Sequence, residues 1–281
     1  MPTQNTRRAD GIGAPLPRIE DLRLLTGQGR YAGDFFPENL CHAALVRSPH
    51  AHARIRSIDG SAAMALPGVL AVLTGEDAAA DGMGAIPHNP DWAGPPDAEL
   101  RLPEGFDVHL TENMPLPADT VRYVGEALAL VVAETAALAA EAAERVEVEY
   151  EPLPVLVYPE QSMKLHAPKI HEDLQSNVLA EREFSRGDVE EAFRVADATA
   201  GGRFHFTRTS PVTIEARAVL ADYDRANKSL NLSSTTQIPG ILKDKLSEIF
   251  DLPGARVRVM APDVGGGFGG KTSLYSEEIV A

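Results

Sequence analysis

Cysteine is nearly absent from this chain, which contains Cys41 and no second cysteine among its 281 residues. A single thiol excludes a disulfide framework within the chain. It also excludes an iron–sulfur cluster held by the chain's own cysteines, because such a cluster takes several thiolates. Cys41 lies in the apolar run 40–46, so we expect a buried and unreactive side chain.

Basic residues and long apolar runs are also scarce. Lysine and arginine total 26 against 41 aspartate and glutamate residues, and the net charge of −15 argues against nucleic acid or an anionic membrane as the main partner. No apolar run approaches the ~20 residues of a membrane-spanning helix. Residues 1–10 lack the apolar core of a signal peptide, and none follows the Arg7–Arg8 pair, so we expect a cytoplasmic location.

The remaining composition is that of a folded protein. Hydrophobic residues make up 44% of the chain and charged residues 24%, and the length suffices for two cores. Prolines interrupt residues 151–177 and leave little regular pattern, which indicates a linker. We therefore predict an N-terminal arm (1–18), a first domain (19–155), a linker (156–177) and a second domain (178–281).

The spacing of apolar residues predicts helices and strands in both domains. In the first domain we expect strands at 40–46 and 53–59 and a buried strand at 68–74. A strand at 122–133, a helix at 136–145 capped by Thr135 and a strand at 146–150 are expected to form one compact α/β element. The proline-rich stretch 81–118 predicts a long loop, whose Trp92 either anchors a subunit contact or packs on its own domain.

The second domain is predicted to be α+β. Its expected elements are strands at 178–184, 198–206, 218–223, 229–235 and 256–261, a short helix capped by Asp188, and an amphipathic helix at 239–250 with Ile241, Leu242, Leu246, Ile249 and Phe250 on its apolar side.

A glycine-rich loop directly follows the last of these strands. Five of the six residues 265–270 are glycine, and only Phe268 interrupts them. Such a run persists where the backbone needs unusual dihedral angles or close approach to another group. Successive bare N–H groups form a concavity for anions or oxo groups. The loop is therefore a candidate wall of a cofactor site.

The same loop also satisfies a phosphate-binding pattern. Gly265, followed after four residues by Gly270, Lys271 and Thr272, fits G-x-x-x-x-G-K-[ST]. A P-loop domain needs further parallel strands after the loop, one of them with a Mg²⁺-binding aspartate. The few residues after Thr272 cannot build that sheet, so the context disfavours a nucleotide-binding site.

The loop sequence GGGFGGK resembles the glycine motif of the molybdenum hydroxylases, the family of xanthine dehydrogenase, aldehyde oxidase and aerobic carbon monoxide dehydrogenase large subunits. Other segments are similar to the same family and occur in its order, which makes the resemblance far more specific than one motif. These segments are residues 15–27, 29–31, 46–53, 124–129, 149–154 and 235–239.

The resemblance implies cofactor contacts for five residues. Gln237 corresponds to a glutamine that hydrogen-bonds an oxygen ligand of molybdenum; its alternative role is a helix cap. The backbone around Phe268 corresponds to the segment that meets this ligand and the pterin, and it comprises Gly266, Gly267, Phe268 and Gly269. No catalytic residue or metal ligand is assigned within the chain.

Several other polar residues leave alternatives open. Lys271 either pairs with a phosphate or carboxylate or is a solvated charge. Glu215 and Arg217 resemble a position near the family's substrate channel, or form a cross-strand ion pair. His50 and His52 share one face of an extended strand, where a structural turn is favoured over a metal pair because no third ligand is near.

Two positions depart from the resemblance. Thr272 stands where xanthine-oxidising members have a glutamate that contacts the purine, which disfavours a purine substrate and fits the carbon monoxide dehydrogenase-like branch. Gly240 stands where many relatives have histidine.

The resemblance implies an α/β hammerhead-like domain followed by the first molybdenum-cofactor-binding α+β domain. It also implies a molybdenum–molybdopterin cofactor, in the cytosine dinucleotide form. The implied reaction hydroxylates an aldehyde, N-heterocycle or related small organic carbon centre with water as the oxygen source. Electrons would leave through iron–sulfur clusters to FAD on partner subunits.

The family's catalytic glutamate and most of its pterin contacts lie in a later domain. We therefore expect this chain to need a C-terminal molybdopterin-binding half and to be inactive alone, whether it is a natural split subunit or a fragment. The alternative functions are a non-catalytic scaffold subunit of such a complex and the P-loop nucleotide binder.

Overall fold

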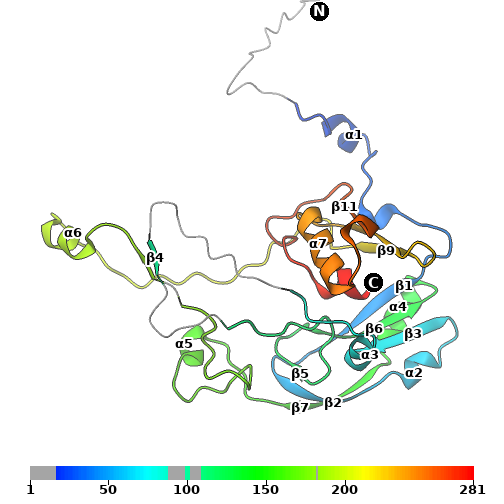
Figure 1. Ribbon diagram of the computed structural model, residues 1–281, viewed down its shortest axis with the longest axis horizontal. Coiled ribbons are helices and arrows are strands. Elements are labelled where there is room, and N and C mark those ends of the chain that lie inside the picture. The colour runs from blue at the N-terminus through cyan, green and yellow to red at the C-terminus, as the bar shows by residue number, and fades with distance from the viewer. Residues whose placement is uncertain (1–16, 88–98, 102–108, 182) are drawn as a thin grey trace, which may run out of the picture.

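The computed structural model describes residues 17–87, 99–101, 109–181 and 183–281, and Figure 1 traces the chain. Most of the predicted N-terminal arm and the proposed anchor Trp92 lie outside the described residues. No helix within the described ranges has the length and apolar character needed to cross a membrane.

The first sheet has strand order β1 (His42–Arg47), β6 (Ala127–Ala133), β3 (Val69–Thr74), with both pairs antiparallel. The central strand β6 is the expected apolar strand, and its Leu128 and Val131 are fully buried. The edge strand β3 is less buried than predicted, because Leu70 is 48% and Leu73 40% exposed. An edge strand has a neighbour on one side only, and a continuous apolar run does not reveal this.

Helix α4 (Ala136–Ala143) packs on this sheet against β1 and β6. The Thr135 hydroxyl accepts the Leu138 N–H at 3.2 Å, which confirms the predicted cap. Two shorter helices flank β3. They are α2 (Ser61–Met64) and α3 (Gly75–Ala80), which is capped by Thr74 and was not predicted.

The second sheet has strand order β5 (Thr120–Val121), β2 (Ala53–Asp59), β7 (Glu147–Pro152), again antiparallel. Strands β6 and β7 therefore belong to different sheets, but Val131 of β6, Ala142 of α4 and Val148 of β7 pack in one cluster, so the predicted compact element over 122–150 forms without its two strands pairing. The helix between them carries the chain from one sheet to the other. Periodicity identifies a strand but not the strand that will pair with it.

The segment between the two domains is largely irregular. It contains α5 (Pro159–Ser162), the strand β8 (Glu183–Ser185) and α6 (Val189–Val195), and β8 pairs antiparallel with β4 (Glu99–Arg101) from the proline-rich stretch 81–118. Asp188 caps α6, as predicted, by accepting the Glu191 N–H at 2.9 Å. The predicted strand 198–206 is wrong, because these residues have no ladder partner in the described part of the chain.

The C-terminal domain is built on the sheet β9 (Val219–Asp224), β10 (Ser229–Ser234), β11 (Val257–Met260). Strand β10 runs antiparallel to β9 and parallel to β11. Helix α7 (Pro239–Ile249) makes the crossover between the parallel pair, and a short 3-10 turn, η2 (Gly254–Arg256), leads into β11. Together the antiparallel sheets and this single parallel pair agree with the predicted α+β class.

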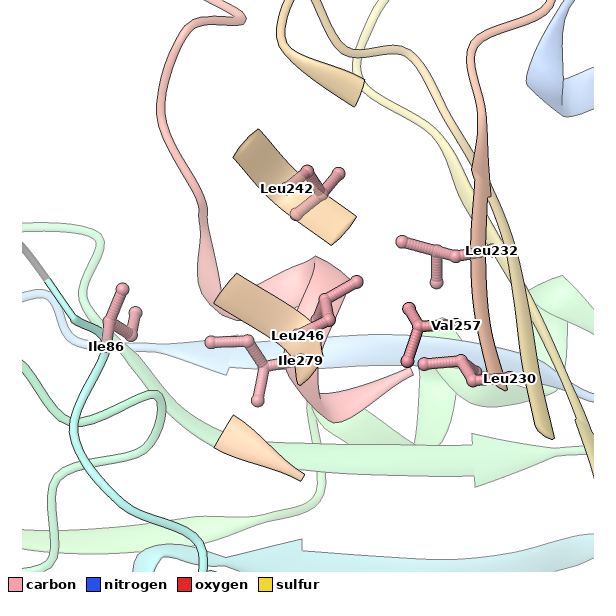
Figure 2. Packing of buried hydrophobic residues seen from close by; sticks show 7 residues of the cluster. All are labelled: Ile86, Leu230, Leu232, Leu242, Leu246, Val257 and Ile279. Carbon is pink, nitrogen blue, oxygen red and sulfur yellow. The ribbon is translucent and has the colours of Figure 1, made fainter. Parts of the chain in front are cut away.

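Figure 2 shows the core of this domain. Leu230, Leu232 and Val257 point from the sheet towards Leu242 and Leu246 of α7. Two further side chains complete the cluster: Ile279 of α8 (Ser276–Val280) and Ile86 from the start of the proline-rich loop. Ile241, predicted on the apolar side of α7, is instead 56% exposed.

The first described residues lie beside the C-terminal domain rather than beside the two sheets of the first domain, which follow them in sequence (Figure 1). They form α1 (Asp21–Leu25) and the 3-10 turn η1 (Ala32–Asp34). Tyr31, just before η1, makes a parallel β-bridge to Asp263, three residues after the end of β11.

Candidate functional site

The parallel pairing of β10 and β11 brings the predicted site residues together. Gln237 follows the carboxyl end of β10, and the glycine loop follows the carboxyl end of β11. Neighbouring parallel strands end at the same edge of their sheet, and in α/β proteins this edge is where ligands bind.

Gln237 packs directly on the glycine loop. A Cβ added to Gly267 would lie 2.4 Å from Cδ of Gln237, so a side chain at position 267 would displace the carboxamide. Oε1 of Gln237 accepts the N–H groups of Gly269 at 3.1 Å and Lys271 at 3.3 Å. Because both partners are donors, the carboxamide oxygen faces the loop, and its NH₂ group is left to bind another acceptor.

Gln237 does not cap the following helix. The N-cap of α7 is Ile238, whose N–H binds the Thr236 hydroxyl at 3.1 Å. The helix-cap alternative for Gln237 is therefore wrong.

The loop leaves three consecutive backbone donors unused. Among the described residues, no acceptor is found for the N–H groups of Gly266, Gly267 and Phe268, whereas the amides on both sides of them are bonded. Gly266 has φ +98° and Phe268 has φ +49°. The Phe268 side chain is 80% exposed. Successive N–H groups of this kind form a concave site for an oxyanion or an oxo group.

A buried ion pair between Lys271 and Glu215 anchors the end of the loop. Lys271 is 3% exposed, and its ammonium group donates to Oε2 and to the backbone carbonyl of Glu215, both at 3.1 Å. Of the roles left open for Lys271, pairing with a carboxylate is the one observed. The P-loop alternative is not supported, because this lysine is turned away from solvent into a protein contact.

Glu215 and Arg217 do not pair with each other as one alternative predicted. Arg217 binds Glu277 at 2.8 Å and stacks on Tyr275, with its guanidinium carbon 3.7 Å from the ring centre. Tyr275 in turn donates its hydroxyl to the carbonyl of Gly270 at 2.7 Å.

A cavity of about 730 Å³ lies beside the loop, between the two domains. Arg47 at the end of β1 reaches across to Glu277 at 2.5 Å. Burial works to raise the pKa of Glu277, but its backbone N–H and the guanidinium groups of Arg217 and Arg47 outweigh burial, so the pKa is lowered. Sequence patterns missed this cavity because its walls come from distant parts of the chain.

Asp263 connects the glycine loop to the N-terminal segment. Its carboxylate accepts from the Arg23 guanidinium, at 2.6 Å for Nη2 and Oδ1, and from the Arg30 N–H at 2.7 Å. Its own N–H donates to the Arg30 carbonyl at 2.9 Å. The hydrogen bond from Arg23 and then that from Arg30 lower the pKa of Asp263 to about 2. No local sequence pattern predicts the contact of Asp263 with Arg23 and Arg30, because these residues are more than 230 positions away.

The remaining candidates lie in structural contacts. Nδ1 of the buried His52 is 2.9 Å from the Pro154 carbonyl, and the His50 ring packs on Tyr150. Within the described ranges no group of three potential ligands could hold a metal ion. Cys41 is exposed, so its predicted burial is wrong: it precedes β1 instead of lying in the strand.

Thr272 closes the turn after the glycine loop. Its hydroxyl donates to the Gly269 carbonyl at 2.7 Å.

Two families match the sequence. Residues 170–281 match the family described as "Molybdopterin cofactor-binding domain". Residues 26–93 and 98–154 match "Aldehyde oxidase and xanthine dehydrogenase, a/b hammerhead domain".

Similar proteins include the nicotine 6-hydroxylase large subunit of Paenarthrobacter nicotinovorans, 38% identical over 96% of this chain, and the carbon monoxide dehydrogenase large chain of Afipia carboxidovorans, 34% identical over 99%. The alignments cover 31% and 34% of these relatives. The chain therefore spans about a third of the length of the relatives it matches.

Solved structures also match nearly the whole of this chain over about a third of their own length. Quinoline 2-oxidoreductase from Pseudomonas putida 86 has a TM-score of 0.81 and 35% identity, covering 94% of this chain and 32% of that one. The structure titled Cu,Mo-CO dehydrogenase has a TM-score of 0.79 and 33% identity, covering 98% of this chain and 34% of that one.

Proposed function

We propose, from the premise that this chain belongs to the xanthine dehydrogenase, aldehyde oxidase and carbon monoxide dehydrogenase large-subunit family, that it forms one side of the molybdopterin site of a molybdenum hydroxylase. Its fold is the family's hammerhead domain followed by a molybdopterin-binding domain, as predicted. The domain limits 19–155 and 178–281 stay predictions, as does the cytoplasmic location.

The observation that carries this proposal is the set of unused donors at the glycine loop. The N–H groups of Gly266, Gly267 and Phe268 lie beside the carboxamide of Gln237, whose NH₂ group is free of the loop. An oxo group or pterin oxygen needs donors of this kind. The fit is steric as well, because a Cβ at Gly267 would collide with Gln237.

The chain's residues would bind and orient the cofactor. A bound molybdenum–pterin group supplies the chemistry that oxidises the substrate carbon and accepts its electrons. The NH₂ group of Gln237 would donate a hydrogen bond to an oxygen of the cofactor, and the N–H groups of residues 266–268 would donate to neighbouring acceptor atoms. The N–H of Gly269 would hold Oε1 of Gln237 against the loop, which leaves the NH₂ group facing the cofactor. No residue of this chain is assigned as the catalytic base.

We propose further that the active enzyme is a hetero-oligomer. Its other parts would be a C-terminal molybdopterin-binding half, an iron–sulfur subunit and an FAD subunit, with the pterin in its cytosine dinucleotide form. Exposed apolar side chains within residues 193–214 support a covering partner. They include Phe193, Phe204, Phe206, Val212 and Ile214, each at least 63% exposed, and exposure on this scale is typical of a surface that binds another protein.

The proposed substrate is an aldehyde, an N-heterocycle or a related small organic compound, hydroxylated with oxygen from water. Relatives named for nicotine and quinoline support the heterocycle class. Thr272 disfavours a purine, because its hydroxyl is already bonded to the loop and it offers no carboxylate.

The test is metal analysis of the complex purified with its C-terminal partner, compared with the isolated chain. We expect molybdenum and turnover in the complex and no turnover in the chain alone. Gln237→Ala should lower molybdenum content or kcat/KM by about tenfold or more, since it removes a cofactor contact.

A matched control is Gln161→Ala, on the exposed helix α5, which should leave molybdenum content and turnover unchanged. A scaffold subunit predicts the opposite result, with no molybdenum in the complex and no effect of Gln237→Ala. Turnover by the isolated chain would also refute the proposal.

A further inference from the structure

Glu215 contacts the glycine loop at both of its ends. At the start, the Gly265 N–H donates to Oε2 of Glu215 at 2.5 Å, and the Glu215 N–H donates to the Gly265 carbonyl at 3.3 Å. At the end, the Lys271 ammonium donates to the same oxygen Oε2 and to the Glu215 carbonyl. One residue on the neighbouring segment therefore holds the first glycine and the lysine after the last.

The contact is tight and largely shielded from water. The Lys271 side chain is 2% exposed and that of Glu215 15%. A Cβ added to Gly265 would lie 2.5 Å from Cβ of Glu215, so the loop lies directly on this residue. A buried lysine requires a partner, and removing either member of such a pair leaves the other charge uncompensated.

We propose that Glu215 and Lys271 are positioning residues that clamp the two ends of the glycine loop, while Gln237 binds the amides of Gly269 and Lys271. With both ends fixed, the N–H groups of Gly266, Gly267 and Phe268 are presented in one arrangement before any ligand arrives. Neither clamp residue needs to touch the cofactor. The link to molybdenum rests on the proposed function, but the effect on the loop does not.

The first test measures amide hydrogen exchange in the loop of the isolated chain. Lys271→Met keeps most of the side-chain length and removes the ammonium group, so the carboxylate loses its cation and the loop should open more often. We expect the bonded amides of Gly265, Gly269, Gly270 and Lys271 to exchange about tenfold faster or more, with exchange in β6 and α4 unchanged. Unchanged loop exchange in a folded Lys271→Met variant would overturn the proposal.

Lys245→Met is the matched control. This lysine lies on α7 of the same domain and pairs with Glu248 at 3.4 Å on the helix surface. The same substitution here should leave loop exchange at the unmodified rate. Acceleration equal to that of Lys271→Met would show a general loosening of the domain and would contradict the clamp.

A double variant separates positioning from simple stability. Glu215→Leu with Lys271→Met leaves no uncompensated charge, so its melting temperature should recover relative to Lys271→Met even if the single variant folds poorly. The Gly265 N–H would lose its acceptor, because Glu215 supplies it, so loop exchange should stay fast. Recovery of loop protection together with the melting temperature would overturn the proposal.

The second test follows molybdenum in the assembled complex. The complex that carries Lys271→Met should release molybdenum about tenfold faster during gel filtration than the unmodified complex does. Equal release, with a loosened loop, would show that the clamp does not serve the cofactor. If the unmodified complex holds no molybdenum, the proposed function fails while the exchange experiment still decides the clamp.

Discussion

Three side chains fix the glycine loop from different directions. Glu215 holds its two ends, Gln237 holds the amides of Gly269 and Lys271, and Asp263 ties the chain just before it to the N-terminal segment. The Asp263 contact is also the one with the clearest pH dependence, because the carboxyl pKa lies well below its ordinary value.

We expect Asp263 to titrate at about pH 2 in the folded chain. The folded-state pKa lies below the ordinary aspartate value of 3.8. The contact with Arg23 is therefore fully present above the ordinary aspartate value and is lost as the pH falls through the folded-state pKa. Carbon NMR of the side-chain carboxyl gives the inflection directly, and Arg23→Met should move it up towards 3.8.

Arg18→Met serves as the control, because the Arg18 guanidinium contacts Asp21 instead. It should leave the Asp263 inflection in place. An inflection near the ordinary aspartate value in the unmodified chain would contradict the assigned ion pair.

At the scale of single residues, the sequence predicted the site where one short motif contains most of its residues. The glycines and Gln237 were predicted as one site, and the structure brings them together through the parallel pair β10 and β11. The partners of charged residues were not predictable. Glu215 was paired with Arg217 in one interpretation because they are neighbours in sequence, yet each binds a residue more than fifty positions away.

At the scale of single elements, α7 decides the stability of the C-terminal domain. It covers the sheet with Leu242 and Leu246, which are 1% and 0% exposed, and also provides the crossover that makes β10 and β11 parallel. The position of the site therefore depends on how firmly this helix is packed.

Leu246→Ala should lower the free energy of unfolding by about 2–5 kcal/mol, because it removes a fully buried side chain and leaves a cavity in the cluster of Figure 2. Urea denaturation followed by circular dichroism gives the change. Ile241→Ala on the same helix should cost less than about 1 kcal/mol, since this side chain is mostly exposed. Equal losses for the two variants would contradict the packing.

Helices and strands with a strong apolar periodicity were predicted well, but the strands that pair with one another in a sheet were not. Helix α4 and its Thr135 cap, helix α7 and strands β9 to β11 lie close to their expected limits. Strand 198–206 was predicted from its alternation, but a strand also needs a neighbour to bond its backbone. The placement of β6 and β7 in separate sheets likewise depends on pairing across the chain.

At the scale of the whole molecule, Glu277 joins the two domains. It binds Arg47 from the hammerhead domain and Arg217 from the C-terminal domain with the same carboxylate oxygen. The cavity beside the glycine loop is lined by all three of these residues, so their contact forms part of its wall.

A double-mutant cycle of Arg47→Met and Glu277→Gln should give a coupling free energy of about 1 kcal/mol, because the pair is partly shielded. Urea unfolding of the four proteins measures it. The exposed pair Arg145 and Glu141, one turn apart on α4, is the control and should give about 0.3–0.5 kcal/mol. A coupling near zero for Arg47 and Glu277 would mean that other contacts hold the domains together.

The bond between Arg23 and Asp263 joins residues 240 positions apart. A ribosome builds the chain from its amino end, so α1 cannot make this bond until the chain has been made as far as Asp263. Leu22 and Leu25 of α1 are exposed even with the bond formed, so they are open to chaperones or to premature association during that interval and after it. Slow translation of the residues between Arg23 and Asp263 would lengthen that interval, because the glycine loop is tied to α1 only once Asp263 is in place.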